Sequence, residues 1–146
     1  MSELIPSDRL ARSVSRVTSA MMGRTFRVAA VQSPVVLWRT VVLPIPGKRP
    51  VTVALSSDRS GCAALASAML GMAEDDIGVD MIDDFMRELL NMTAGQIKAE
   101  LSLDQALGLP RVRDGDALFA QPPQWTHHIL DSDSINLVVS IVAALV

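Results

Sequence analysis

The first regular pattern along the chain is a helical spacing of apolar residues over positions 7–23. One side of this segment is apolar and a second side is basic, at Leu10, Val14, Val17 and Met21, and at Arg9, Arg12 and Arg16. Because residues three and four positions apart share one face of a helix, the segment is predicted to be an amphipathic helix. The arginines could meet an acidic partner, although a solvated charged face is the commoner arrangement.

Valine-rich segments follow this helix and predict successive strands over positions 26–32, 35–43 and 51–55. Pro34 divides the first two strands, and a turn of sequence Pro-Ile-Pro-Gly-Lys at positions 44–48 divides the second from the third. Near the end of the chain, positions 125–130 and 135–145 predict two further strands around the Asp-Ser-Asp sequence at 131–133. A hairpin is therefore expected to close the fold.

A second helix is predicted between a cap at Ser57 or Asp58 and a C-terminal stop at Gly71. The residues expected to face inward are Ala64, Leu65, Ala68 and Met69. Small side chains on this face would allow the helix to pack closely on a sheet.

The longest helical pattern covers positions 80–103. Its expected core side consists of Ile82, Phe85, Met86, Leu89, Met92, Thr93 and Ile97. At 100° per residue, the opposite side is a stripe roughly 80° wide. This stripe contains Asp84, Glu88, Asn91, Gly95 and Lys98.

Together these elements predict one domain over residues 1–146 with an α/β (α+β) sandwich fold. Its sheet is expected to be mainly antiparallel, with three helices packed against it. The longest apolar run, at 135–146, contains a serine and is shorter than the roughly 20 residues that a membrane-spanning helix needs. We therefore interpret this run as a buried strand.

The composition narrows the kinds of partner that the chain can have. Its formal net charge is −3 over 146 residues, and nucleic acids and anionic membranes favour clustered lysine and arginine. A protein partner is therefore favoured, with no nucleic acid and no membrane expected. The single cysteine, Cys62, cannot form an internal disulfide, and charged residues interrupt the first positions. Both features predict a cytoplasmic protein.

The sequence offers little support for metal or nucleotide chemistry. His127 and His128 are neighbours in a predicted strand, so they should point to opposite faces and should not chelate one metal ion. Gly47 and Lys48 lack the spacing of a phosphate-binding loop, and no nucleophile elbow or dinucleotide fingerprint is present. We therefore expect no metal site and no cofactor held by the chain itself.

Glu88 and Asn91 form the most suggestive pair in the polar stripe. They are three positions apart, so their Cβ atoms should lie about 5 to 6 Å apart and both side chains can reach one external point. Gly95 follows one turn later, although a helix interior glycine costs about 1 kcal/mol relative to alanine, which suggests that a partner approaches the backbone there. A Glu and Asn pair at this spacing would nevertheless occur by chance about one time in three in a chain of this length.

The longer string that contains this pair is more specific. Positions 84–95 read Asp-Phe-Met-Arg-Glu-Leu-Leu-Asn-Met-Thr-Ala-Gly, which resembles the signature helix of the CheC, CheX and FliY phosphatases. That signature has Asp or Ser, three residues, Glu, two residues and Asn, followed by an apolar residue and an Ala-Gly pair. The other predicted helices lack the motif, so a single site resembles the CheX branch. Leu89, Leu90 and Gln96 depart from the residues that are common at their positions.

The resemblance implies a function in two-component signalling. A CheX-like protein would hydrolyse the phospho-aspartate of a CheY-like receiver domain, whose own magnesium ion assists the reaction. By the same resemblance, Asn91 would position the attacking water and Glu88 would pair with the receiver's lysine. Gly95 and Lys98 would contact the partner, and Asp84 would either support Glu88 or contact the partner as well. A homodimer is also expected. The alternative is a non-catalytic module that binds or sequesters a receiver through the same helix.

Overall fold

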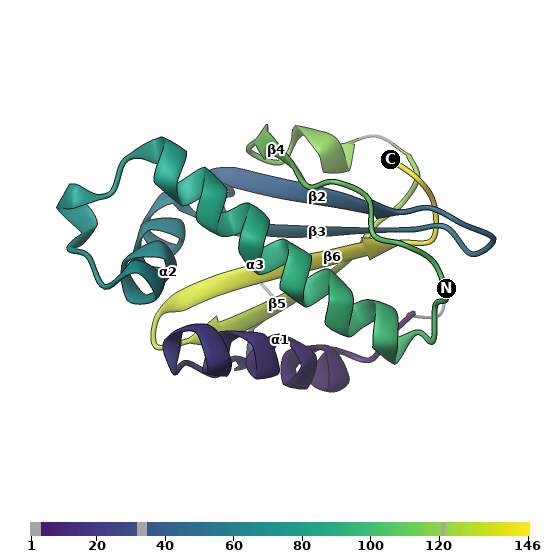
Figure 1. Cartoon of the computed structure of the whole chain (residues 1–146), viewed down its shortest axis with the longest axis horizontal. Helices are drawn as coiled ribbons and strands as arrows, with labels where there is room; N and C mark the ends of the chain where they lie inside the picture. Colours follow the sequence, from purple (N-terminus) through teal and green to yellow (C-terminus); the bar gives the residue numbers. More distant parts are fainter. Residues whose placement is uncertain (1–3, 32–34, 121) are drawn as a thin grey trace.

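The computed structural model describes residues 4–31, 35–120 and 122–146, and one antiparallel sheet forms its centre (Figure 1). The order of the strands across the sheet is β1-β5-β6-β3-β2-β4. Every pair of neighbours is antiparallel. The strands are β1 (Arg27–Val28), β2 (Arg39–Ile45), β3 (Val51–Ser57), β4 (Arg111–Asp114), β5 (Thr126–Ser132) and β6 (Ile135–Val142).

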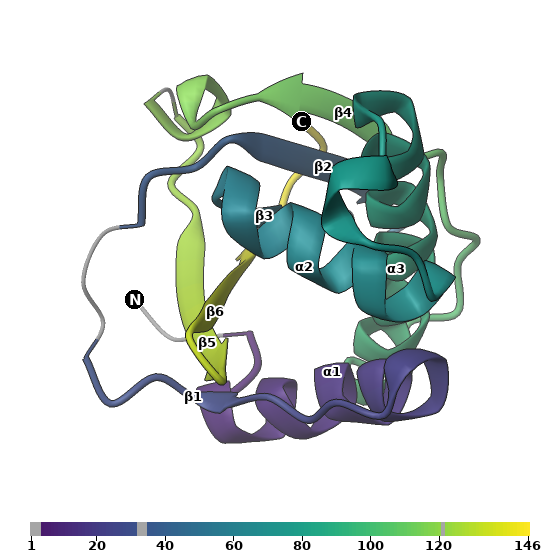
Figure 2. The same cartoon turned by 90° about the vertical axis from the view of Figure 1, so that its left-hand side faces the viewer.

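Three helices cover one face of this sheet, as Figures 1 and 2 show. They are α1 (Ser7–Met22), α2 (Arg59–Leu70) and α3 (Val79–Glu100), with two short 3-10 helices, η1 (Glu74–Asp76) and η2 (Ala117–Ala120). Alternate strand residues face the helices and form one core with them, as Val41, Leu43 and Ile45 of β2 illustrate. The predicted sandwich of a mainly antiparallel sheet and three helices is therefore confirmed.

The predicted boundaries of α1 and α2 agree with the structure, whereas α3 ends at Glu100, before the predicted end at 103. One predicted helix face is also wrong. Asp58 caps α2 by accepting a hydrogen bond from the backbone N–H of Gly61 at 2.6 Å, and Gly71 ends the helix with a left-handed φ of 65°. Leu65 is buried as expected, whereas Ala68 and Met69 are exposed. Because α2 lies beside one end of the sheet (Figure 1), its last turn is left uncovered, and the expectation that these two residues face inward is wrong.

The strands differ from the prediction mainly at the edges of the sheet. Within the described part of the strand expected at 26–32, only the two residues of β1 are strand, and β2 begins at Arg39 rather than at position 35. Position 32 and the expected divider Pro34 lie outside the described residues. Pro44, expected in a turn, lies within β2. The closing hairpin is confirmed, but its turn is at Asp133 and Ser134, which have positive φ values of 46° and 67°. The edge strand β4 was not predicted, because it is short and mostly exposed and so lacks a strong apolar alternation.

Two ion pairs attach α3 to its neighbours. Near the start of the helix, the Nε atom of Arg39 lies 3.1 Å from a carboxylate oxygen of Asp83. The same guanidinium lies 2.6 Å from Asp114 of β4. At the other end, Arg9 of α1 pairs with Glu100. The helix that carries the polar stripe is thus held at both ends.

The thiol of Cys62 lies in the core, where α2 packs on the sheet. Burial, which disfavours the charged thiolate, raises its pKa to about 12, and the nearby Asp58 acts in the same direction.

Within the described part of the chain, no helix has the length and apolar character needed to cross a membrane.

Candidate functional site

The exposed stripe of α3 is the candidate site, and the packing of the helix determines which residues it contains. The buried side of α3 consists of Ile82, Phe85, Met86, Leu89, Leu90, Thr93, Ala94 and Ile97. On the opposite side, Asp84 and Glu88 are exposed, and Asn91, Gly95 and Lys98 are partly exposed. The five residues that the sequence placed in one stripe therefore lie together on the surface of one helix.

Glu88 and Asn91 are the carboxylate and amide that lie closest together in this stripe, three positions apart. Both lie in the middle of the regular helix, so their Cβ atoms are about 5 to 6 Å apart. Among the residues that the structure describes, neither side chain has a hydrogen-bond or salt-bridge partner. The carboxylate of Glu88 and the amide of Asn91 are therefore free to bind a partner molecule.

Asp84 has a partner within its own helix. Its carboxylate accepts a hydrogen bond from the guanidinium of Arg87 at 2.7 Å. Because both side chains are largely exposed, this pair contributes little to stability and can exchange for another partner. Asp84 therefore contacts Arg87 rather than Glu88 in the free chain.

Gly95 is not required by the packing of this chain. A Cβ atom built at Gly95 would meet no heavy atom within 4 Å, so no neighbour excludes a larger residue. The glycine lies inside a regular helix, where alanine would be more stable. Its presence is therefore consistent with close approach by a partner.

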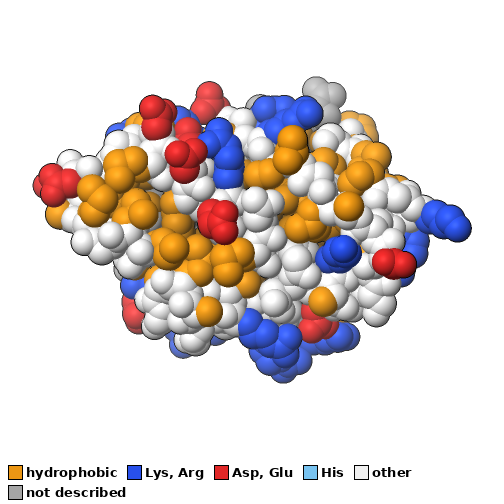
Figure 3. Space-filling view, in the orientation of Figure 1, with side chains coloured by type: hydrophobic (Ala, Val, Ile, Leu, Met, Phe, Trp, Pro, Cys, Tyr) orange, Lys and Arg blue, Asp and Glu red, His pale blue; other side chains and the backbone are white. Residues whose placement is uncertain are grey.

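The structure corrects the assignment of Met92. It was expected in the core, but 38% of its surface is exposed, whereas Leu90 is fully buried. Met92 is one of four large apolar residues that α2 and α3 leave exposed; these residues, here called the apolar flank, are Met69, Leu70, Val79 and Met92. Hydrophobic side chains gather over α2, the first half of α3 and the adjacent end of α1 in Figure 3. Sequence reasoning missed this flank because both methionines fit the edge of an apolar helical face.

The departures at Leu89 and Leu90 do not alter the exposed surface. Both residues are 0% exposed, so they fill the core beneath Glu88 and Asn91. Their bulk therefore serves to hold the helix on the sheet rather than to meet a partner.

The two histidines point to opposite faces of the sheet, as predicted. His128 is buried and its Nδ1 atom lies 2.7 Å from the hydroxyl of Ser7, whereas the Nδ1 atom of His127 lies 2.6 Å from the hydroxyl of Ser140. Across residues 4–31, 35–120 and 122–146, no group of three or more His, Cys, Asp or Glu side chains is arranged to hold a metal ion.

Comparison with known proteins places this geometry in context. The family model described as "Chemotaxis phosphatase CheX" matches residues 39–130, which is more than half of the chain and includes the whole of α3. No curated protein matches the sequence.

Several solved structures share the fold. A putative chemotaxis protein from Desulfovibrio vulgaris Hildenborough is 21% identical with a TM-score of 0.70, over 91% of this chain and 92% of that one. Chemotaxis protein CheX from Vibrio vulnificus is 15% identical with a TM-score of 0.72, over 97% and 98% of the two chains. A CheX-CheY-BeF3-Mg2+ complex from Borrelia burgdorferi gives 14% identity and a TM-score of 0.70, over 97% and 99%. At these identities the structures establish the shared fold.

Proposed function

The chain belongs to the CheX family of chemotaxis phosphatases, and from this premise we propose that it hydrolyses the phospho-aspartate of a CheY-like receiver domain. The observation that carries the proposal is the position of Glu88 and Asn91. They occupy the two motif positions of an exposed helix stripe and have no partner among the described residues. The CheX protein from Borrelia burgdorferi has been crystallised with CheY, BeF3 and Mg2+.

Asn91 would act by positioning water. Hydrolysis requires a water oxygen to attack phosphorus in line with the aspartate oxygen, whose bond to phosphorus breaks as inorganic phosphate forms. The Asn91 amide can hold that water through its oxygen or its N–H groups. Catalysis of phosphoryl transfer depends mainly on such positioning and on charge stabilisation, so one well-placed amide is a sufficient contribution from this chain.

Glu88 would anchor the complex. One turn before Asn91, its carboxylate can pair with a lysine of the receiver in a charge-assisted contact. This contact would fix the amide over the phosphoryl group without requiring Glu88 to remove a proton. Each tenfold acceleration needs only about 1.4 kcal/mol, so an ordered water and one ion pair can produce a useful rate.

The surroundings of the pair fit a protein surface. Asp84, Gly95 and Lys98 extend the stripe along the helix, and hydrophobic side chains gather over α2 and the first half of α3 on the face that Figure 3 shows. Exposed methionines adapt to the shape of a partner, and clustered apolar residues commonly mark interaction sites. The receiver would contribute the magnesium ion, and this chain would contribute the docking surface and the water-positioning amide.

The decisive experiment measures the decay of a phosphorylated CheY-type receiver in magnesium buffer, with and without this protein. The proposal expects decay that becomes faster in proportion to the amount of protein added, at substoichiometric concentration. Tight binding of the phospho-receiver with an unchanged decay rate would instead support the non-catalytic module. The expected homodimer stays a prediction, which sedimentation of the purified chain would test.

A Gly95→Ala variant should separate stability from function. Because the added Cβ meets nothing within 4 Å, we expect the free energy of unfolding to rise by about 0.5 to 1 kcal/mol. We also expect the methyl group to hinder docking and to raise the receiver concentration needed for half-maximal acceleration. Urea unfolding and decay assays on the same preparation measure the two effects.

Gln96→Ala is the matched control for Gly95→Ala. Gln96 is the next residue of the same helix and already has a Cβ atom. A Gly95→Ala variant that is both more stable and fully active would show that no partner approaches the backbone at this position.

A further inference from the structure

A groove on the far side of α1 is separate from the site on α3. It lies between α1 and the edge strand β1, has a volume of about 630 Å3, and includes no residue of α3 in its lining. Its apolar floor contains Ala11, Phe26 and Val28. Ala11 and Phe26 are almost fully buried and Val28 is partly exposed, so the groove is shallow and its accessible floor is formed mainly at Val28.

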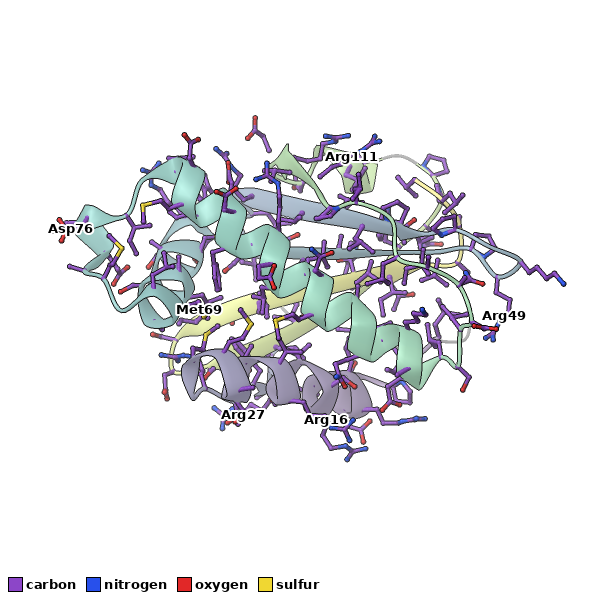
Figure 4. The ribbon with its side chains drawn as sticks, viewed as in Figure 1. Arg16, Arg27, Arg49, Met69, Asp76 and Arg111 are labelled. Atoms are coloured by element: carbon purple, nitrogen blue, oxygen red, sulfur yellow. The ribbon has the colours of Figure 1, made fainter. Side chains whose placement is uncertain are left out.

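Arginines line the rim of this groove. Arg12 and Arg16 come from α1, and Arg27 comes from β1. Figure 4 shows the labelled Arg16 and Arg27 on the α1 side of the molecule. The rim is therefore basic although the whole chain has a net charge of −3.

These arginines are available to an outside group. Arg16 has no salt bridge among the described residues. Arg12 lies 3.9 Å from Asp8, which also lines the groove, and Arg27 lies 2.8 Å from Asp131. Because the side chains of Arg12 and Arg27 are 67% and 84% exposed, these pairs are weak and can exchange for a better partner.

The edge of the sheet opens towards the same groove. The hydroxyl of Ser15 accepts a hydrogen bond from the N–H of Phe26 and donates one to its C=O, both at 2.9 Å, so these groups point towards α1. Ala29 instead donates its N–H to Ile129 of β5 at 2.9 Å. Backbone groups alternate in direction along an antiparallel strand, so those of Val28 point away from β5 and into the groove. An edge strand in this position can accept an extended segment.

We propose that the groove between α1 and β1 binds an acidic segment of a partner protein that also contains apolar side chains. The carboxylates of that segment pair with Arg12, Arg16 and Arg27, and its apolar side chains contact the partly exposed Val28. Arg16 is the most informative of these residues because no internal pair competes for it. The outward-facing backbone groups of Val28 favour an extended segment over an anionic membrane, which offers no strand to pair with them. Because α3 takes no part, the segment and a receiver can bind at the same time.

The test uses a fluorescein-labelled peptide in which glutamate alternates with leucine, followed by fluorescence anisotropy. We expect the parent chain to bind it, and binding to weaken with salt because exposed charges are screened. Arg16→Glu should weaken binding at least about tenfold by turning attraction into repulsion. Arg12→Glu gives a second, independent variant of the same rim. The matched control is Arg49→Glu, which reverses an exposed charge in the distant turn between β2 and β3.

Several results would overturn the proposal. They are a failure of the parent chain to bind the peptide, equal weakening by Arg16→Glu and Arg49→Glu, or equal binding of a peptide with lysine in place of glutamate. Self-association of the chain that only Arg16→Glu abolishes would identify a second copy as the occupant. Binding to phosphatidylserine vesicles without peptide binding would identify a membrane surface. The acceleration of receiver decay should be the same in Arg16→Glu and the parent, which keeps this test independent of the phosphatase proposal.

Discussion

An Asn91→Ala variant is expected to accelerate phospho-receiver decay about a hundredfold less than the parent chain does. The amide is the one uncharged group in the exposed stripe that can hold a water molecule and remain neutral beside a phosphoryl group. Alanine would leave that water unpositioned, so the receiver would return towards its own slow hydrolysis. Asn91 is partly exposed and has no internal partner among the described residues, so the fold should be unaffected.

Single-turnover decay of the phospho-receiver measures this effect at a saturating concentration of each variant. Asn136→Ala is the matched control because it removes the other asparagine of the chain, on β6. Glu88→Ala should differ in kind, since losing the anchor mainly raises the concentration needed for half-maximal acceleration. An Asn91→Ala variant that is as fast as the parent chain would exclude the proposed role of the amide.

A Leu89→Ala variant is expected to lower the free energy of unfolding by about 2 to 5 kcal/mol. Leu89 is 0% exposed and is part of the main core, directly beneath the exposed pair. Truncation removes apolar contacts and leaves a cavity that the packed sheet and helices can fill only in part. For a chain of ordinary stability this is a large share of the total.

Urea denaturation followed by circular dichroism measures the loss. Met92→Ala provides the comparison, because it also truncates an apolar residue of α3 but one that is 38% exposed. Its cost should be below about 1 kcal/mol. Equal costs for the two variants would contradict the assignment of Leu89 to the core and Met92 to the surface.

The three helices could be predicted because each has a periodic apolar face or a local capping signal. Asp58 and Gly71 define the ends of α2 through interactions with their immediate neighbours. The edges of the sheet could not be predicted in the same way. β1 pairs Arg27 with Asp131, about a hundred positions away, and β4 depends on alignment with β2. Such pairings are decided by tertiary contacts, which local propensity does not contain.

The stripe on α3 could be predicted because positions along one regular helix follow from its angular spacing. The apolar flank could not, because Met69 and Met92 fit an inward or an outward position equally well. Which one they adopt depends on where α2 meets the end of the sheet. The groove at β1 was likewise invisible in the sequence, since its lining comes from two segments whose distance is set by the fold.

The burial of Cys62 has a practical consequence. A thiol with a pKa of about 12 stays protonated at neutral pH, and in the core it is out of reach of alkylating reagents. Because the sequence has no other cysteine, a new cysteine at an exposed position such as Asp84 would be the sole target of a maleimide dye. The chain is thus a ready scaffold for single-site fluorescent labelling, and the arrival of a partner at α3 can be followed in real time.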